Sequence, residues 1–238
     1  MEKIIYALWR GPEATAQQLG RQLLDEIGPQ LAQTPGVRAV RINLPDAHVE
    51  RAASLCQLTT QPPFDAVLQI WLDACHGECR APIDALCNRA AARLAAWLVT
   101  ESEVIRNRLH PSKDGVRTAG WAQVCFLQKP ERLTHEQWLL AWQEQHTPVA
   151  IETQANFEYV QNLIARQVVG EPLPFSAMVE ECFPESAMDD PQVFFDAVGD
   201  PEKLRRNTEK MMASCARFID FERIDVLPTS QYVIKSLC

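Results

Sequence analysis

RLTHEQWLLAWQEQHTPVAIETQANFEYV, residues 132–160, combines a well-marked helix start with the beginning of a strand. Thr134 is the predicted N-cap, because its hydroxyl can accept a hydrogen bond from a first-turn N–H and Gln137 can complete a capping box. Trp138 and Trp142 are four residues apart, so their rings share one face of the helix. The stretch therefore predicts an amphipathic helix that is followed by a strand.

His146 stands near the predicted end of this helix, since Pro148 disfavours helical geometry at Thr147. A histidine in the last turn can donate to free carbonyls, and its charged form is stabilised by the helix dipole. Its unperturbed pKa of about 6.5 also suits acid–base chemistry at neutral pH. A helix-capping role and a chemical role therefore both stay open for His146.

The composition narrows the class of protein. The 238 residues carry a net charge of −8, which disfavours nucleic acid and anionic membrane surfaces as partners. No apolar run approaches the roughly 20 residues that span a bilayer, and residues 1–9 (MEKIIYALW) lack the basic region of a signal peptide. We therefore expect a cytoplasmic protein whose cysteines are reduced.

The cysteines raise the question of a metal site. Cys75, His76 and Cys79 form the sequence CHGEC, a spacing that zinc sites permit. A second such pair is missing, and a free cysteine commonly behaves as a small buried hydrophobe. We therefore predict no metal site, and metal binding at CHGEC is the alternative.

The order of predicted elements in residues 1–110 recurs in residues 119–238. Each half is predicted as β-α-β-β-α-β, and Thr15 and Pro29 are separated by the same distance as Thr134 and Pro148. The polar segment HPSKDGVRT, residues 110–118, is the predicted linker. This pattern predicts an α+β fold of tandem ferredoxin-like repeats.

A ferredoxin-like unit leaves one face of its sheet without helices. Two such faces can bury each other and enclose a barrel-like interior. The duplicated chain is therefore predicted to form, by itself, the α/β-barrel that half-length proteins would build by dimerising. Residues 82–100, which are rich in Ala, Leu and Arg, are predicted as one of its helices.

Alternation along the predicted strands assigns residues to the two faces of the sheet. Phe64, Ala66, Leu68, Ile70 and Leu72 are assigned to the helix-covered face, as are Val124 and Phe126. The opposite face is mixed, and it contains Trp121, Gln123, Cys125, Ser176, Met178, Glu180 and Cys182.

A half-polar face inside a barrel is typical of a small-molecule cavity. Glu180, Gln123 and Tyr159 are therefore expected to converge in that cavity. The alternative is that this polar set is the solvated face of an open sheet.

The second half resembles the EthD family of dimeric α/β-barrel proteins. The resemblance is carried by FLQK (126–129), ERLTHEQWLLAWQEQHTPVA (131–150) and FEYVQN (157–162). The residues that match the family pattern are Trp142, His146, Pro148, Tyr159, Gln161 and Asn162. The first half matches only in its order of elements, with Ile27 in the place of His146, so at most one half has a His-centred site.

The resemblance implies a range of activities. Similar proteins include decarboxylases, and cyclases or dehydratases of aromatic polyketides, and the wider barrel group includes cofactor-free monooxygenases and haem enzymes. A cofactor-free lyase or oxygenase acting on an aromatic or degradative-pathway substrate is the expected function. The alternative is a non-catalytic ligand-binding or accessory protein of a catabolic pathway.

The resemblance and the predicted cavity together suggest roles for individual residues, with Glu180, Trp121 and Gln123 contributed by the predicted cavity alone. His146 and Glu180 are the expected proton carriers, and the expected substrate contacts are Trp121, Gln123, Trp142, Tyr159 and Gln161. No cofactor is expected, with haem as the alternative. Pairing of the duplicated chain into a homodimer stays open.

Overall fold

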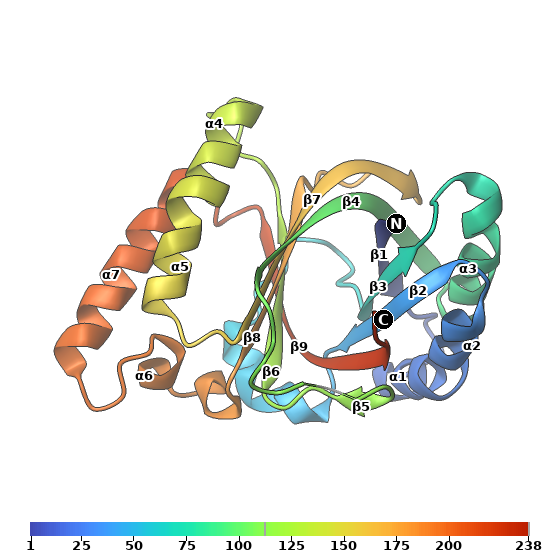
Figure 1. Cartoon of the computed structure of the whole chain (residues 1–238), viewed down its shortest axis with the longest axis horizontal. Helices are drawn as coiled ribbons and strands as arrows, with labels where there is room; N and C mark the ends of the chain where they lie inside the picture. Colours follow the sequence, from blue (N-terminus) through green and yellow to red (C-terminus); the bar gives the residue numbers. More distant parts are fainter. Residues whose placement is uncertain (112, 238) are drawn as a thin grey trace.

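The computed structural model describes residues 1–111 and 113–237 of the chain. Ser112, in the predicted linker, and Cys238, the last residue of the predicted second repeat, lie outside the described residues. The strands form a barrel, and helices pack on two opposite sides of it (Figure 1).

The first half follows the predicted β-α-β-β-α-β order. Its strands are β1 (Glu2–Trp9), β2 (Val37–Leu44), β3 (Ala66–Leu72) and β4 (Arg93–Ile105). Its helical segments are α1 (Ala16–Gln22), the π-helical η1 (Leu23–Ile27), α2 (Gly28–Gln33), the 3-10 segment η2 (Ala47–Leu55) and α3 (Gly77–Ala90). The strand order is β2-β3-β1-β4, which is the ferredoxin-like arrangement.

The second half repeats this arrangement. Its strands are β6 (Trp121–Leu127), β7 (Glu158–Val169), β8 (Ala177–Phe183) and β9 (Ile224–Lys235), and a short β5 (Val116–Arg117) pairs with β9. Its helical segments are α4 (His135–Leu139), the π-helical η3 (Leu140–His146), α5 (Thr147–Thr153), η4 (Glu185–Met188), α6 (Pro191–Phe194) and α7 (Pro201–Phe218). The corresponding order is β7-β8-β6-β9.

Two antiparallel pairings join the halves and close the barrel. β4 pairs with β7 along most of its length, and β2 pairs with β9. Among the described residues this makes an eight-stranded antiparallel barrel inside one chain. Closure leaves these strands without free edges, and it confirms the predicted α+β barrel. The repeat boundaries at residues 110 and 119 stay a prediction.

The predicted helix start at Thr134 is confirmed. Its side chain accepts from Gln137 N and the Gln137 side chain accepts from Thr134 N, and Thr15 is capped in the same way. The predicted helix end at Thr147 is wrong, because α5 continues to Thr153. Pro148 sits in the first turn of α5, where its missing N–H costs no intrahelical bond.

The predicted helix over residues 82–100 is also wrong. The helix is α3, which ends at Ala90, and β4 begins at Arg93. Leu94, Ala95, Ala96 and Trp97 are all buried. A strand that is covered on both faces loses the apolar–polar alternation by which strands are predicted.

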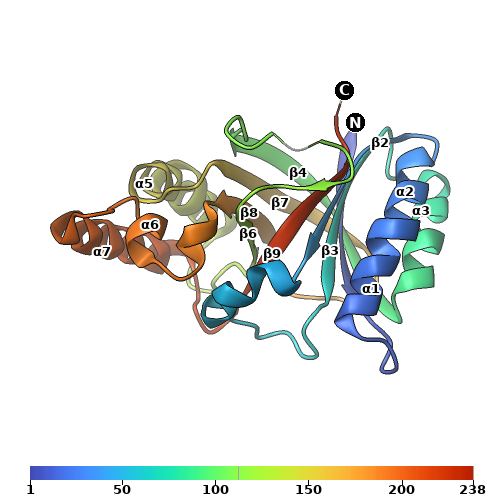
Figure 2. The same ribbon diagram turned by 90° about the horizontal axis from the view of Figure 1, so that it is seen from below.

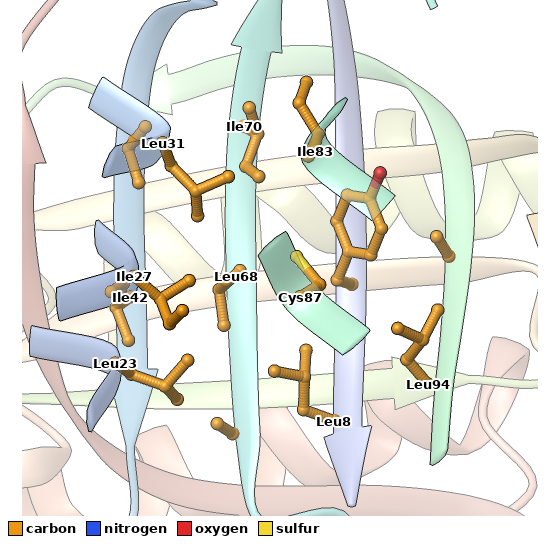
Figure 3. Close-up of a cluster of buried hydrophobic side chains, with 14 of the residues drawn as sticks. Leu8, Leu23, Ile27, Leu31, Ile42, Leu68, Ile70, Ile83, Cys87 and Leu94 are labelled. Atoms are coloured by element: carbon orange, nitrogen blue, oxygen red, sulfur yellow. The ribbon is translucent and has the colours of Figure 1, made fainter. Parts of the chain in front are cut away.

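Each sheet face has its own core. The face of the first half that carries Leu8, Leu68 and Ile70 packs on α1, η1, α2 and α3 (Figure 3). Figure 2 shows these helices stacked on one side of the barrel, with α5, α6 and α7 on the other. Trp97 and Phe126 belong to a separate apolar cluster. This cluster contains residues of both halves and fills the barrel interior.

This packing corrects part of the predicted assignment of strand side chains to the two faces of the sheet. Ala66, Leu68, Ile70 and Leu72 pack on helices as predicted, but Phe64, Val124 and Phe126 point into the barrel. Cys125, which was assigned to the barrel side, packs under the helices instead. Alternation groups the residues of a strand into two sets, but it does not say which set faces the helices.

No helix in the described ranges is both long enough and apolar enough to cross a membrane.

Candidate functional site

Strand β8 carries two consecutive acidic residues, Glu180 and Glu181. Side chains on a strand alternate between its faces, so Glu180 points into the barrel and Glu181 points toward α5 and α7. We call these two faces of the second sheet the barrel side and the helix side.

On the helix side, Glu181 lies in the middle of a row of polar residues. Strand pairing places it beside Gln123 of β6 on one flank and Tyr159 of β7 on the other. Gln123 is half-buried although β6 lies within the sheet, whereas Tyr159 is buried. The row thus runs from an accessible amide to a buried phenol.

Among the described residues, Glu181 has few hydrogen-bond partners. Only 8% of its surface is exposed, and its hydrogen bond comes from Asn156 Nδ2 at 2.9 Å. Burial raises the pKa of Glu181 to about 7, against the opposing effect of the Asn156 bond. Burial and the charge of Glu181 together raise the pKa of the nearby thiol of Cys215 to about 12. Glu181 can therefore accept or release a proton near neutral pH, while Cys215 stays a thiol.

A chain of hydrogen bonds ties Tyr159 to the helices. Gln161 Nε2 donates to Tyr159 Oη and to Thr147 Oγ1, each at 2.8 Å. The Thr147 hydroxyl donates to the carbonyl of Trp142 at 3.3 Å. Burial and the charge of Glu181 raise the pKa of Tyr159 well above its ordinary value. Tyr159 is therefore a neutral phenol held in place at the end of η3.

His146 ends η3 and contacts α7. Its Nδ1 lies 3.0 Å from Ser214 Oγ, and its ring centroid lies 4.7 Å from that of Phe218. Only 8% of its surface is exposed, and burial lowers its pKa to about 4. The imidazole is therefore neutral at pH 7 and joins the two helical segments.

Glu180, on the barrel side, has the opposite environment. It accepts hydrogen bonds from Arg41 Nη1 and Asn43 Nδ2 at 2.7 Å each, from Gln69 Nε2 at 2.8 Å and from Gln231 Nε2 at 3.0 Å. Burial alone would raise the pKa of Glu180, but Arg41 and the three amides outweigh it and lower the pKa to about 2. Glu180 is therefore a fixed carboxylate that holds β2, β3 and β9 against β8.

The expected convergence of Glu180, Gln123 and Tyr159 is wrong, because the sheet separates Glu180 from the other two. The remaining candidates His146, Trp142 and Gln161 lie on the helix side with Tyr159. The catalytic and substrate-binding roles of all these residues stay predictions.

Trp121 stands apart from this group. Its ring stacks on Phe183 at a centroid distance of 5.3 Å, and it belongs to a cluster with residues of η2 and η4. Stacking on Phe183 accounts for the position of the ring, and the substrate-binding role of Trp121 stays a prediction.

Glu181 was missed by the sequence analysis. Its signal was present, since Glu180 and Glu181 are adjacent acids on one predicted strand and must occupy opposite faces. Assigning the mixed face of the strand to the barrel side made Glu180 the candidate and not Glu181.

The metal and haem alternatives can be tested on the geometry. Within residues 1–111 and 113–237 no group of three or more His, Cys, Asp or Glu side chains could hold a metal ion, although His76 Nε2 lies 3.3 Å from Cys79 Sγ. Ligation of a haem by His146 would require the imidazole to face an open slot. His146 is packed against Phe218 and bonded to Ser214, so its surroundings do not fit a haem.

Residues 130–222 match the EthD domain family. The match begins after β6 and ends before β9, so it includes η3, β7, β8 and α7. It confirms the resemblance for this part of the chain. No curated protein matches the chain significantly.

Solved structures share the whole architecture. An anthrone oxidase-like protein aligns with a TM-score of 0.52 and 8% identity over 100% of this chain and 94% of its own. A candidate monooxygenase from Fusobacterium nucleatum subsp. nucleatum aligns with a TM-score of 0.51 and 8% identity over 98% of this chain and 92% of its own. At such low identity the likeness concerns the fold alone.

Proposed function

We propose that the EthD domain in residues 130–222 provides a small-molecule site whose chemistry is proton transfer. The protein would be a cofactor-free lyase or oxygenase that acts on an aromatic or degradative-pathway substrate. The observation that supports this proposal is Glu181, a buried acid whose pKa is raised to about 7. An acid with such a pKa can work in either protonation state at neutral pH.

The proposed first step is removal of a proton from a phenol or an activated C–H by the Glu181 carboxylate. Gln123 is the accessible amide beside it and would hydrogen-bond the substrate, and the Tyr159 phenol would donate to the oxygen that gains charge. His146, being neutral and only weakly basic, would supply a hydrogen bond rather than remove the proton. A lyase would then break a carbon bond, whereas an oxygenase would pass the carbanion to molecular oxygen.

A second candidate is a ligand-binding or accessory protein without turnover. The packing of His146 favours it, because an imidazole that bonds Ser214 and packs at a tilt against Phe218 has a sufficient structural role. Trp142 and Tyr159 are buried in the apolar cluster that also contains Phe218.

Anthrone is a suitable probe of both candidates, because deprotonation at its methylene carbon is the step that an acid–base group would assist. With oxygen it gives anthraquinone and water, so one O₂ is consumed per anthrone. We expect the protein to accelerate oxygen uptake, with a rate that rises through pH 7 as Glu181 ionises. Glu181→Gln should lower kcat by roughly 10²–10⁴-fold.

Glu209→Gln is the matched control. Glu209 is an exposed acid on α7 and pairs with Arg205, so its loss should leave kcat unchanged. Anthraquinone binding without turnover, measured by calorimetry, would support the accessory role instead. Turnover that Glu181→Gln does not reduce would refute the proposed role of this residue.

A further inference from the structure

Lys3 is a buried lysine at the rim of the barrel. It lies at the start of β1, where it pairs in the sheet with Trp71 of β3 on one side and Val99 of β4 on the other. Only 3% of its surface is exposed. Lysines are rarely buried to this extent, because a charged amine loses its hydration there. A buried lysine whose pKa shifts is also the kind that serves as a nucleophile in proteins.

The amine of Lys3 has an acidic partner and an aromatic partner. Glu101 of β4 accepts from Nζ through Oε2, while its Oε1 accepts from Trp71 Nε1 at 3.1 Å. Nζ also lies 4.3 Å from the centroid of the Trp71 ring. The amine is therefore held in one place, beside a carboxylate that can take up its proton.

Burial has the largest effect on the ionisation of Lys3, because it disfavours the charged amine. The charges that act on it come from three strands. Glu101 of β4 and Glu180 of β8 favour the ammonium, whereas the Arg41 guanidinium of β2 disfavours it. The net result lowers the pKa of Lys3 to about 8. At pH 7 a much larger fraction of this amine is therefore neutral than of an ordinary lysine, and the neutral amine is the nucleophile.

A cavity of about 440 Å³ adjoins this pair, and Lys3 and Glu101 both line it. Leu98, Val99 and Ala165 give the same cavity an apolar lining. Ala165 is exposed, so the lining reaches the surface of the protein. A volume of this size is in the range of pockets that hold small molecules. A small apolar molecule can thus be placed next to the amine and its acid.

We propose that Lys3 is a nucleophilic amine that forms a Schiff base with a small aldehyde bound in this cavity. Glu101 takes the ammonium proton, and the free amine adds to the carbonyl carbon. Glu101 then returns the proton to the oxygen of the carbinolamine, which leaves as water. The net reaction converts one ammonium and one aldehyde into one protonated imine and one water. The carbon chain of the aldehyde lies against Leu98 and Val99.

The partners of the ammonium also suit the product. A protonated imine has the same positive charge, so it keeps the ion pair with Glu101 and the contact with the Trp71 ring. Lys3, Trp71 and Glu101 all belong to the first half of the chain. This site is therefore separate from the proposed chemistry at Glu181, and neither proposal depends on the other.

Propanal with cyanoborohydride tests the proposal, because the reductant converts an imine into a stable propylamine. Peptide mass spectrometry then gives the rate of propylation at each lysine. The internal control is Lys210, an exposed lysine that is also paired with a glutamate, Glu152. At pH 7 we expect Lys3 to react at least about tenfold faster than Lys210. Its rate should rise with pH and level off above about pH 8. A rate at Lys3 equal to or below that at Lys210 would overturn the proposal.

Variants separate the amine from the cavity. Lys3→Arg keeps a cation beside Glu101 but removes the nucleophile, so propylation at this position should be lost. Lys210→Arg is the matched control and should leave the rate at Lys3 unchanged. Ala165→Trp narrows the cavity from its exposed side, so the rate at Lys3 should fall while the rate at Lys210 stays the same. Undiminished propylation of Lys3 in the Ala165 variant would refute the assignment of this cavity.

Glu101→Gln tests the role of the acid. The variant loses the charge that favours the ammonium, so the pH at which the rate at Lys3 levels off should move below that of the wild-type protein. A purely structural role of Glu101 would leave this pH unchanged, and that result would exclude the carboxylate as the proton carrier.

Discussion

Glu180 and Glu181 are neighbours in the chain and are both buried, but the two faces of β8 give them opposite properties. Glu180 has one guanidinium and three amides around it, and its pKa falls to about 2. Within the described residues Glu181 has a single amide partner, Asn156, and its pKa rises to about 7. The comparison teaches that burial does not set the charge of an acid; the number and charge of its partners do.

The two faces also differ in what they hold together. On the barrel side, the partners of Glu180 come from β2, β3 and β9, so its network joins both halves of the chain. On the helix side, Glu181 and its neighbours come from the second half alone. Removing Glu180 should therefore affect the fold, whereas removing Glu181 should affect a site.

The largest effect is expected from Glu180→Ala. It leaves Arg41 and three amides without their common acceptor in a buried place, which should lower the free energy of unfolding by about 3–5 kcal/mol. Urea denaturation at pH 7 measures the loss. Glu180→Gln keeps an acceptor and should lose less, and a stable Glu180→Ala protein would show that the network does not hold the halves together.

The pH dependence of stability should have opposite signs for the two acids. The folded-state pKa of Glu181 lies above its usual value of 4.5, so wild-type protein should lose stability relative to Glu181→Gln as the pH rises from about 4.5 to 8, by about 3 kcal/mol. The folded-state pKa of Glu180 lies below 4.5, so the advantage of wild type over Glu180→Gln should vanish as the pH falls from about 4.5 to 2.

Urea denaturation of the three proteins across this range measures both differences. Each wild-type–variant difference also cancels the contribution of His146, whose lowered pKa makes the protein less stable as the pH falls from about 6.5 to 4. Parallel slopes for the two variants would contradict the distinction between the faces.

A smaller effect on stability is expected from His146→Ala. The variant loses the bond to Ser214 and the contact with Phe218, which should cost about 1–3 kcal/mol while the fold is kept. Any turnover that is found should fall, but by less than in Glu181→Gln, because His146 supplies a hydrogen bond and does not remove the proton. His146→Asn can restore the bond to Ser214, so recovery of stability without recovery of turnover would separate the two roles, and full activity in His146→Ala would exclude a catalytic one.

The smallest effect is expected from Trp121→Phe. The indole Nε1 is buried and, within the described residues, has no hydrogen-bond partner, so its removal should cost about 1 kcal/mol or less. Stacking on Phe183 is kept by a phenyl ring. Binding of aromatic probes should not change, and a clear loss measured by calorimetry would support Trp121 as a substrate contact.

Much of the fold was predictable from local signals. The capping boxes at Thr15 and Thr134 begin corresponding helices, and the repeated order of elements predicted a duplicated barrel. The prediction of a helix over residues 82–100 was wrong because the first part of β4 is buried on both faces, so its residues show no alternation. The prediction that the helix ends at Thr147 was wrong because Pro148 can begin a helical turn as well as follow the end of one.

The candidate site was predictable only in part. His146, Trp142, Tyr159 and Gln161 were found and do lie on one side of the sheet. Glu181, the acid that lies on the same side as these residues, was not predicted, since a choice between Glu180 and Glu181 is a choice between two faces. Side chains alternate between the two faces with a period of two residues, but this alternation does not show which face lies in the barrel.

The sequence by itself determined the order of the elements, the internal repeat and the division of each strand into two sets of side chains, because these depend on neighbours along the chain. Only the tertiary structure decided which set faces the barrel, that Arg41 reaches Glu180 across 139 positions, and that Glu181 has a single amide partner. A pKa depends on distances to charges and on exclusion of water, and both are set by segments far apart in the sequence.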